Sequence, residues 1–226
     1  MLQKIIKNIA DNKNTKSLSH QYRSKRFKFF LSLLNSLPRP INIIDIGGTP
    51  EFWKAMNFQE PGVTITLLNL DEISEIELPF KSIKGDATNL VNIADQSYDI
   101  VFSNSVIEHL FTWENQQKMA AEVKRVGKYH FIQTPNYWFP IEPHWVFPFF
   151  QFFPKKVRYW LTRYFALGHI GKISDDDAAK KQVEEVRLLS KSELKNLFPQ
   201  SSVFSEKFIF FNKSFTAYTI GKEYSK

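Results

Sequence analysis

An acidic residue followed by two glycines ends an apolar segment early in the chain. The segment Ile41-Asn-Ile-Ile-Asp45-Ile-Gly47-Gly48-Thr49-Pro50 is β-branched up to the acid and glycine-containing after it. This pattern is typical of a buried parallel strand that is followed by a tight strand-to-helix turn, and in such folds the turn binds a nucleotide-like ligand. Capping the next helix is the alternative role for Asp45, but an unpaired acid in an apolar strand is costly, which favours ligand binding.

Polar residues also end the strands that are predicted further along the chain. They are Asn69, Leu70 and Asp71 after the second strand, Asp86 and Ala87 after the third, and Asn104 and Ser105 after the fourth. Ligand contacts in open α/β sheets gather at the carboxyl ends of the strands. An ordinary turn residue is the alternative for Asp86, and the sequence does not choose between Asn69 and Asp71.

His109, Glu142 and His144 are the candidate catalytic residues. The unperturbed pKa of histidine lies near neutrality, so His109 could take a proton from an acceptor hydroxyl, with simple packing as the alternative. Glu142 and His144 come just after the fifth predicted strand. They could act as base and orienter, or as half of a metal site.

Alternating strands and helices are expected to position these residues. Apolar segments predict strands at 41–46, 63–71, 80–84, 98–105 and 129–134, and helical spacing predicts helices at 17–37, 50–56, 106–110, 113–126 and 190–198. Two further strands, 203–211 and 214–220, form a hairpin that turns at Asn212-Lys213. The expected fold class is α/β: a doubly wound, Rossmann-like, seven-stranded, mostly parallel sheet with a C-terminal antiparallel hairpin.

Residues 136–175 interrupt this alternation with many prolines and aromatic side chains. The prolines argue against a membrane span, and the aromatic content argues against a solvated loop. We interpret the segment as an insertion that covers the active site. We interpret its aromatic side chains Trp138, Phe139, Trp145 and Phe149 as packing within this lid rather than as a specific ligand cage.

The motifs resemble those of class I S-adenosylmethionine-dependent methyltransferases, nearest to the small-molecule type 11, 12 and 23 branches, which include many bacterial enzymes. The resemblance covers residues 41–140 and implies S-adenosylmethionine as the cofactor. In that family the acid matching Asp45 orients the methionine ammonium, an acid after the second strand holds the ribose, and the acid matching Asp86 contacts adenine. Ser103-Asn104-Ser105 with Glu108-His109 resembles the fourth motif. The implied cofactor residues are Asp45, Gly47, Gly48, Thr49, Asn69, Leu70, Asp71, Asp86, Ala87, Asn104 and Ser105.

Three departures from the family pattern matter. Thr49 and Glu51 stand where the family has glycines, and Asn69 stands where an acid is expected. These changes keep a non-binding relative open as an alternative. In related quinone O-methyltransferases an acid before the Glu-His pair helps to hold a metal; here those positions are Asn104 and Ser105, so no metal is expected.

Composition narrows the function further. The 226 residues suit one domain, and the absence of cysteine excludes disulfides, cysteine-ligated metals and cysteine nucleophiles. No apolar run is long enough for a signal peptide core or a membrane span, so a soluble cytoplasmic protein is expected, with peripheral membrane contact as a variant. The net charge of +7 is concentrated in residues 1–39, which hold nine Lys or Arg against one Asp.

The expected organisation is a basic helical segment at 1–40 and a methyltransferase domain at 41–226 with the lid at 136–175. The expected function is methyl transfer to a small-molecule acceptor, with a sugar or a lipid-linked intermediate as the candidate class. An RNA methyltransferase using the basic arm is one alternative, although the fourth motif lacks the Asn/Asp-Pro-Pro-aromatic box of base-amino methylation. A non-catalytic binding module is the other. The acceptor, the methylated atom and the oligomeric state do not follow from the sequence.

Overall fold

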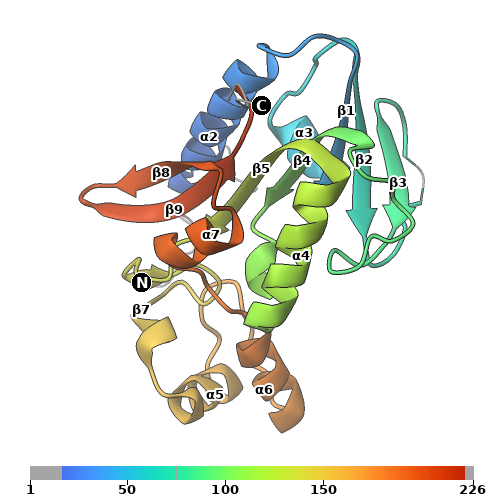
Figure 1. Cartoon of the computed structure of the whole chain (residues 1–226). Helices are drawn as coiled ribbons and strands as arrows, with labels where there is room; N and C mark the ends of the chain where they lie inside the picture. Colours follow the sequence, from blue (N-terminus) through green and yellow to red (C-terminus); the bar gives the residue numbers. More distant parts are fainter. Residues whose placement is uncertain (1–16, 75, 222–226) are drawn as a thin grey trace.

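A seven-stranded sheet forms the centre of the computed structural model, which describes residues 17–74 and 76–221 (Figure 1). Its strands run in the order β3-β2-β1-β4-β5-β9-β8. The first five are parallel, whereas β9 runs antiparallel to β5 and β8 antiparallel to β9. The bounds are β1 (Ile41–Ile46), β2 (Val63–Asn69), β3 (Phe80–Lys84), β4 (Tyr98–Asn104), β5 (Gly127–Pro135), β8 (Ser202–Phe208) and β9 (Phe211–Tyr218). This topology confirms the predicted fold class.

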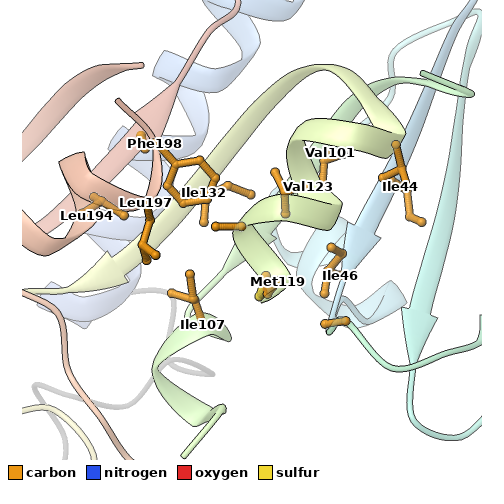
Figure 2. Close-up of a cluster of buried hydrophobic side chains, with 14 of the residues drawn as sticks. Ile44, Ile46, Val101, Ile107, Met119, Val123, Ile132, Leu194, Leu197 and Phe198 are labelled. Carbon is orange, nitrogen blue, oxygen red and sulfur yellow. The ribbon is translucent and has the colours of Figure 1, made fainter. Parts of the chain in front are cut away.

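Helices cover both faces of the sheet, and the two hydrophobic clusters that result share β1. Ile41 and Ile43 belong to the cluster under α2 (Leu18–Leu34) and α3 (Pro50–Ala55). Ile44 and Ile46 belong to the cluster under α4 (Trp113–Val126) and α7 (Lys191–Leu197), which Figure 2 shows. A strand that is apolar on both faces is typical of a buried parallel strand, so the β-branched run of β1 forms the centre of the sheet.

The expected lid segment forms a small layer of its own. It contains β6 (Ile141–Glu142), β7 (Phe147–Pro148), a 3-10 turn η2 (Phe150–Phe152) and α5 (Lys155–Tyr164). Helix α6 (Asp176–Glu185) follows the predicted bounds of 136–175 and packs against α5 in the same layer. Trp145, Phe150, Leu167 and Val183 pack together at the centre of this layer. In Figure 1, α5 and α6 lie at the bottom of the view, below α4.

The N-terminal helix is fixed to the C-terminal hairpin by a buried ion pair. Arg26 on α2 places its Nη1 3.2 Å from both carboxylate oxygens of Glu206 on β8 and 3.4 Å from Ser214 Oγ. Its Nη2 donates to Asn104 Oδ1 at 3.0 Å. Arg26 is therefore part of the protein interior, and its charge is not available to an external polyanion. Lys4, Lys7, Lys13 and Lys16, which the predicted basic arm also includes, lie outside the described residues.

The hairpin turn differs from the sequence prediction. Ile209 and Phe210 form the turn, and Asn212 and Lys213, which we expected there, lie in β9. The reason is tertiary: the Asn212 carbonyl accepts a hydrogen bond of 2.7 Å from Asn136 Nδ2, which keeps this residue in the strand. The local turn preference of the Asn-Lys pair is overridden.

No described helix is both long and apolar enough to cross a bilayer.

Candidate active site

The turn after β1 requires its two glycines for reasons of space. Gly47 has φ +72°, and a Cβ at this position would lie 2.5 Å from Val106 Cγ2. A Cβ at Gly48 would overlap the carboxylate of Asp45. The turn is therefore packed against Val106 and Asp45 so tightly that only glycine fits at the two positions.

Asp45 lies beneath this turn and is only 1% exposed. Its Oδ2 accepts a hydrogen bond of 2.7 Å from Trp53 Nε1 on α3. Burial raises the pKa of Asp45 to about 8, and the Trp53 hydrogen bond opposes this shift. The helix-cap alternative is not what the structure shows, because the N-cap of α3 is Thr49, which is exposed and makes no capping hydrogen bond.

The residues after β2 have separate roles. Asn69 Nδ2 donates to the Gly48 carbonyl at 2.9 Å and so holds the glycine turn in place. Leu70 and Asp71 are exposed, and the Asp71 carboxylate lies 3.2 Å from Lys84 Nζ. Of the two candidates left open by the sequence, Asp71 is the one that presents a solvent-accessible carboxylate at this edge.

The residues after β3 and β4 are also held by local contacts. Asp86 Oδ1 accepts from the backbone N and the Oγ1 of Thr88, both at 2.8 Å, and the next residue, Ala87, is buried. Asn104 is bound by Arg26, as described above. Ser105 has φ +59° and donates from its Oγ to Gln133 Oε1 on β5 at 2.8 Å.

These strand ends form one continuous edge, because β1 pairs with β2 on one side and with β4 on the other. The chain order of the sheet reverses between β1 and β4, and ligands of open α/β sheets bind at such a switch point. A glycine turn, a buried carboxyl and an accessible carboxylate on the next strand are compatible with S-adenosylmethionine. The individual cofactor contacts stay predictions.

A second cluster of polar groups lies at the same edge, and it brings together all three predicted catalytic residues. Glu142 Oε1 lies 2.6 Å from His144 Nδ1, and Glu142 Oε2 accepts from the backbone N of His144 and Trp145 at 2.7 Å each. His144 Nε2 faces His109 Nε2 at 3.1 Å. His109 does not lie on the full helix predicted at 106–110 but on a single 3-10 turn, η1 (Ile107–His109).

Glu108 completes this cluster, although the sequence reasoning had named it only as part of a motif. Its side chain is fully buried, and its Oε2 accepts from Thr134 Oγ1 at 3.0 Å. The only signal in the sequence was its place beside His109 after an apolar strand. Because β4 and β5 are parallel neighbours, the end of β5 delivers Thr134 to the residues that follow β4.

The environment of the cluster shifts the pKa values of its two imidazoles in opposite directions. Burial, together with the charge of nearby His144, lowers the pKa of His109 to about 4. Burial also acts to lower the pKa of His144, but the hydrogen bond and charge of Glu142, together with the charges of Glu108 and Glu185, outweigh it and raise that pKa overall. Burial raises the pKa of Glu108 to about 7. His144 is therefore the more basic imidazole of the pair.

A cavity of about 760 Å³ opens beside this cluster. Glu142 and Trp145 line it, together with Lys155 and Arg158 from α5 and Arg187. The Nε of Arg158 is buried and has no hydrogen-bond partner among the residues that the structure describes. Glu184 and Glu193 also line the cavity, where Lys155 lies 3.7 Å from Glu184 and Arg187 lies 2.6 Å from Glu193, so the cavity combines aromatic side chains with groups of both charges.

Residues 55–130 match the family model of the methyltransferase domain. An uncharacterised protein of Mycobacterium tuberculosis, MT1557, is 35% identical over 80 residues, which are 35% of this chain and 26% of that protein. The chain therefore matches about a quarter of the length of this curated relative.

Two solved structures illustrate the likeness in fold. A SAM-dependent methyltransferase from Methanosarcina mazei has 14% identity and a TM-score of 0.51, with 83% of this chain and 95% of that chain covered. The methyltransferase domain of the bacterial protein CtHen1 has 13% identity and a TM-score of 0.52, with 87% and 98% covered. At these identities the structural likeness establishes the fold, and the family model connects that fold with methyl transfer.

Proposed function

We propose that this class I S-adenosylmethionine-dependent methyltransferase transfers a methyl group to a small-molecule acceptor that carries an anionic group. The observation that carries the proposal is the shared carboxyl edge of β1 and β4. The glycine turn of the cofactor motif lies there, and Val106, which touches Gly47, is only two residues from Glu108 in the second cluster. Cofactor and acceptor groups would thus meet at the switch point of the sheet.

The second cluster supports activation of an acceptor that must lose a proton. Methyl transfer is an in-line displacement at a sulfonium methyl, so alignment of the acceptor atom supplies much of the acceleration. His144 is oriented by Glu142 through its Nδ1, and its Nε2 lies 3.1 Å from His109 Nε2, so the two imidazoles together form the candidate general base. We expect removal of the His144 imidazole to lower kcat more than it raises the KM for the cofactor.

The cavity and its surroundings support a sugar or lipid-linked acceptor with a phosphate or carboxylate. Arg158 lines the cavity, and its buried Nε has no hydrogen-bond partner among the described residues, whereas the other two cations of the lining, Lys155 and Arg187, are paired with Glu184 and Glu193. Exposed aromatic side chains surround this part of the molecule and suit contact with sugar rings or acyl chains. They are Trp138, Phe149, Phe152, Trp160, Tyr164 and Phe165.

Cofactor binding is tested first, by isothermal titration of the protein with S-adenosylmethionine and S-adenosylhomocysteine. We expect micromolar affinity that Asp45→Ala abolishes while the variant stays folded by circular dichroism. Absence of binding to folded wild-type protein would favour the alternative of a non-catalytic module, which Thr49 and Glu51 at glycine positions keep open.

The acceptor class is tested by S-adenosylhomocysteine release with neutral sugars, sugar phosphates and lipid-linked sugar diphosphates. Arg158→Gln should lose the preference for the anionic acceptors, whereas Lys156→Gln, on the same helix but outside the cavity, should keep it. Equal activity of wild-type protein with neutral and anionic acceptors would overturn the anionic part of the proposal.

Binding to vesicles that contain anionic lipid would support peripheral membrane contact. The RNA alternative is weakened by the buried Arg26, and a salt-dependent shift of labelled RNA would revive it.

A further inference from the structure

We propose that Glu108, His109 and His144 bind one divalent transition-metal ion, a site that the sequence did not lead us to expect. One ligand atom from each of the three side chains lies within 4.8 Å of the others. Two imidazole nitrogens and one carboxylate oxygen form a donor set of intermediate softness. Such a set suits Zn²⁺, Mn²⁺, Fe²⁺ or Co²⁺ rather than Ca²⁺ or Mg²⁺, which prefer oxygen ligands alone.

The separation of the two imidazoles fits a shared ion. Their Nε2 atoms lie 3.1 Å apart, and the rings are nearly perpendicular, with an interplanar angle of 88°. Two nitrogens at about 2.0–2.1 Å from one ion are separated by roughly 2.9 Å at a right angle and roughly 3.4 Å at the tetrahedral angle. The observed separation lies between these limits. In the absence of an ion it is also the length of a hydrogen bond between the two imidazoles, which a bound ion would replace.

The lone pairs point the right way. His144 Nδ1 donates a hydrogen bond to the Glu142 carboxylate, which leaves the lone pair on Nε2 to bind an ion. A carboxylate that holds the outer nitrogen of a metal-bound histidine is a common second partner of metal sites. Glu142 itself is held by the backbone N of His144 and Trp145, so His144 is fixed in a ligating orientation before an ion arrives.

Unsatisfied atoms and excess negative charge supply the second, independent argument. Glu108 Oε1 is buried without a hydrogen-bond partner in the described part of the chain, although its other oxygen is bound by Thr134. A buried carboxylate oxygen without a partner is costly, and a cation removes that cost. Glu142 and Glu185 add two more carboxyl groups around the same imidazoles, with Glu185 Oε1 3.5 Å from His109 Nδ1.

An ion held by three protein ligands keeps at least one position open for water or another oxygen donor. On the proposed function, that position would hold the acceptor oxygen and lower its pKa, so that the ion, rather than His144, would make the acceptor nucleophilic. This last step rests on the proposed function, whereas metal binding itself does not.

The test uses the full chain, freed of metal by chelation and titrated with Zn²⁺ and with Co²⁺ in the absence of cofactor and acceptor. We expect one ion per chain by isothermal titration and visible d–d absorption from bound Co²⁺. Glu108→Gln and His144→Ala should weaken binding by at least about 100-fold, and Glu142→Gln by about 10- to 100-fold. His20→Ala on α2 and Glu114→Gln on the surface of α4 are matched controls that should bind as wild type.

A second measurement needs no variant, in case the buried substitutions unfold the protein. The X-ray absorption spectrum of the Zn²⁺-loaded wild-type chain should show two imidazoles and light oxygen ligands. Sub-stoichiometric binding, a spectrum without imidazole scattering, or equal loss of affinity in His20→Ala would overturn the site. Because no methyl transfer is measured, failure of the metal site and failure of the proposed enzymatic function are distinguishable.

Discussion

Replacing Asp45 by Asn should make the protein more stable at alkaline pH. The carboxyl has a pKa of about 8 in the fold and 3.8 as its ordinary value, because it is buried beneath the glycine turn. The folded state therefore binds this proton more tightly than the unfolded state. The stability that the protonated group contributes is present below about pH 4 and is lost as the pH rises to about 8.

The size of the effect follows from the same two values. Each unit of difference in pKa corresponds to about 1.4 kcal/mol, so from pH 5 to pH 8 the wild type loses up to about 4 kcal/mol at this residue. Asn is neutral at both pH values and keeps an oxygen that can accept from Trp53 Nε1. The free energy of unfolding of Asp45→Asn, relative to wild type, should therefore increase by up to that amount between pH 5 and pH 8.

Cofactor binding by wild-type Asp45 should show the reverse dependence. If the ionised carboxylate orients the methionine ammonium, binding at pH 7 requires the release of one proton. The affinity for S-adenosylmethionine should then rise about tenfold, or about 1.4 kcal/mol, from pH 6 to pH 7, where an α-amino group is still largely protonated. Asp45→Asn should bind weakly and without this pH dependence.

Urea denaturation at pH 5 and pH 8 measures the stability effect, and isothermal titration in two buffers of different ionisation enthalpy measures the released proton. Asp95→Asn is the matched control, because Asp95 is an exposed carboxylate bound to Arg125 far along the chain from the turn. The opposite result would be a stability deficit of Asp45→Asn relative to wild type that is larger at pH 8 than at pH 5. It would mean that the carboxylate is paired with a cation in the fold, and it would refute the reasoning from burial.

Two further substitutions test buried polar groups away from the cofactor turn. Arg26→Met leaves the buried Glu206 carboxylate without its ion-pair partner and with only the hydrogen bond from Ser214 Oγ, so we expect a loss of about 3–5 kcal/mol in urea denaturation. The double variant with Glu206→Met should restore much of this loss; equal losses in single and double variants would contradict this. His130 is buried with its Nε2 2.6 Å from Ser201 Oγ, and burial lowers its pKa to about 4 from 6.5. The contribution of neutral His130 to the free energy of unfolding is complete above pH 6.5 and is lost as the pH falls toward 4. The wild type should therefore lose about 3 kcal/mol of stability between pH 6.5 and pH 4, and His130→Gln should not show this loss. A parallel pH dependence of the two proteins would count against this effect.

Local signals in the sequence predicted most elements of the fold. The β-branched run that ends at Asp45 forms β1, and the Ser190-x-x-Glu193 pattern forms the capping box of α7. Both patterns act over a few residues, so no knowledge of the partner elements is needed. The turn at Ile209 and Phe210 was missed because the contact that keeps Asn212 in β9 comes from Asn136, far away in the chain.

The candidate site was predictable only in part for the same reason. The sequence correctly grouped the strand ends at one edge, since parallel strands bring their carboxyl ends together, although β2 ends at Asn69 and not at the predicted residue 71. The sequence could not predict the separate roles of Asn69 and Asp71, because these depend on the direction in which the Gly48 carbonyl points. Nor could the sequence place His144 against His109, because the loop that carries His144 is positioned by its own core around Trp145.

One short segment, residues 104–109, couples the two parts of the site. Ser105 adopts positive φ, which turns the chain at the end of β4 so that Val106 packs against Gly47. Within three residues of that contact the chain reaches Glu108 and His109. A side chain at Gly47 would press on Val106, and because packed interiors transmit displacement, the cluster would move with it. We therefore expect changes in the cofactor turn to alter acceptor activation as well as cofactor affinity.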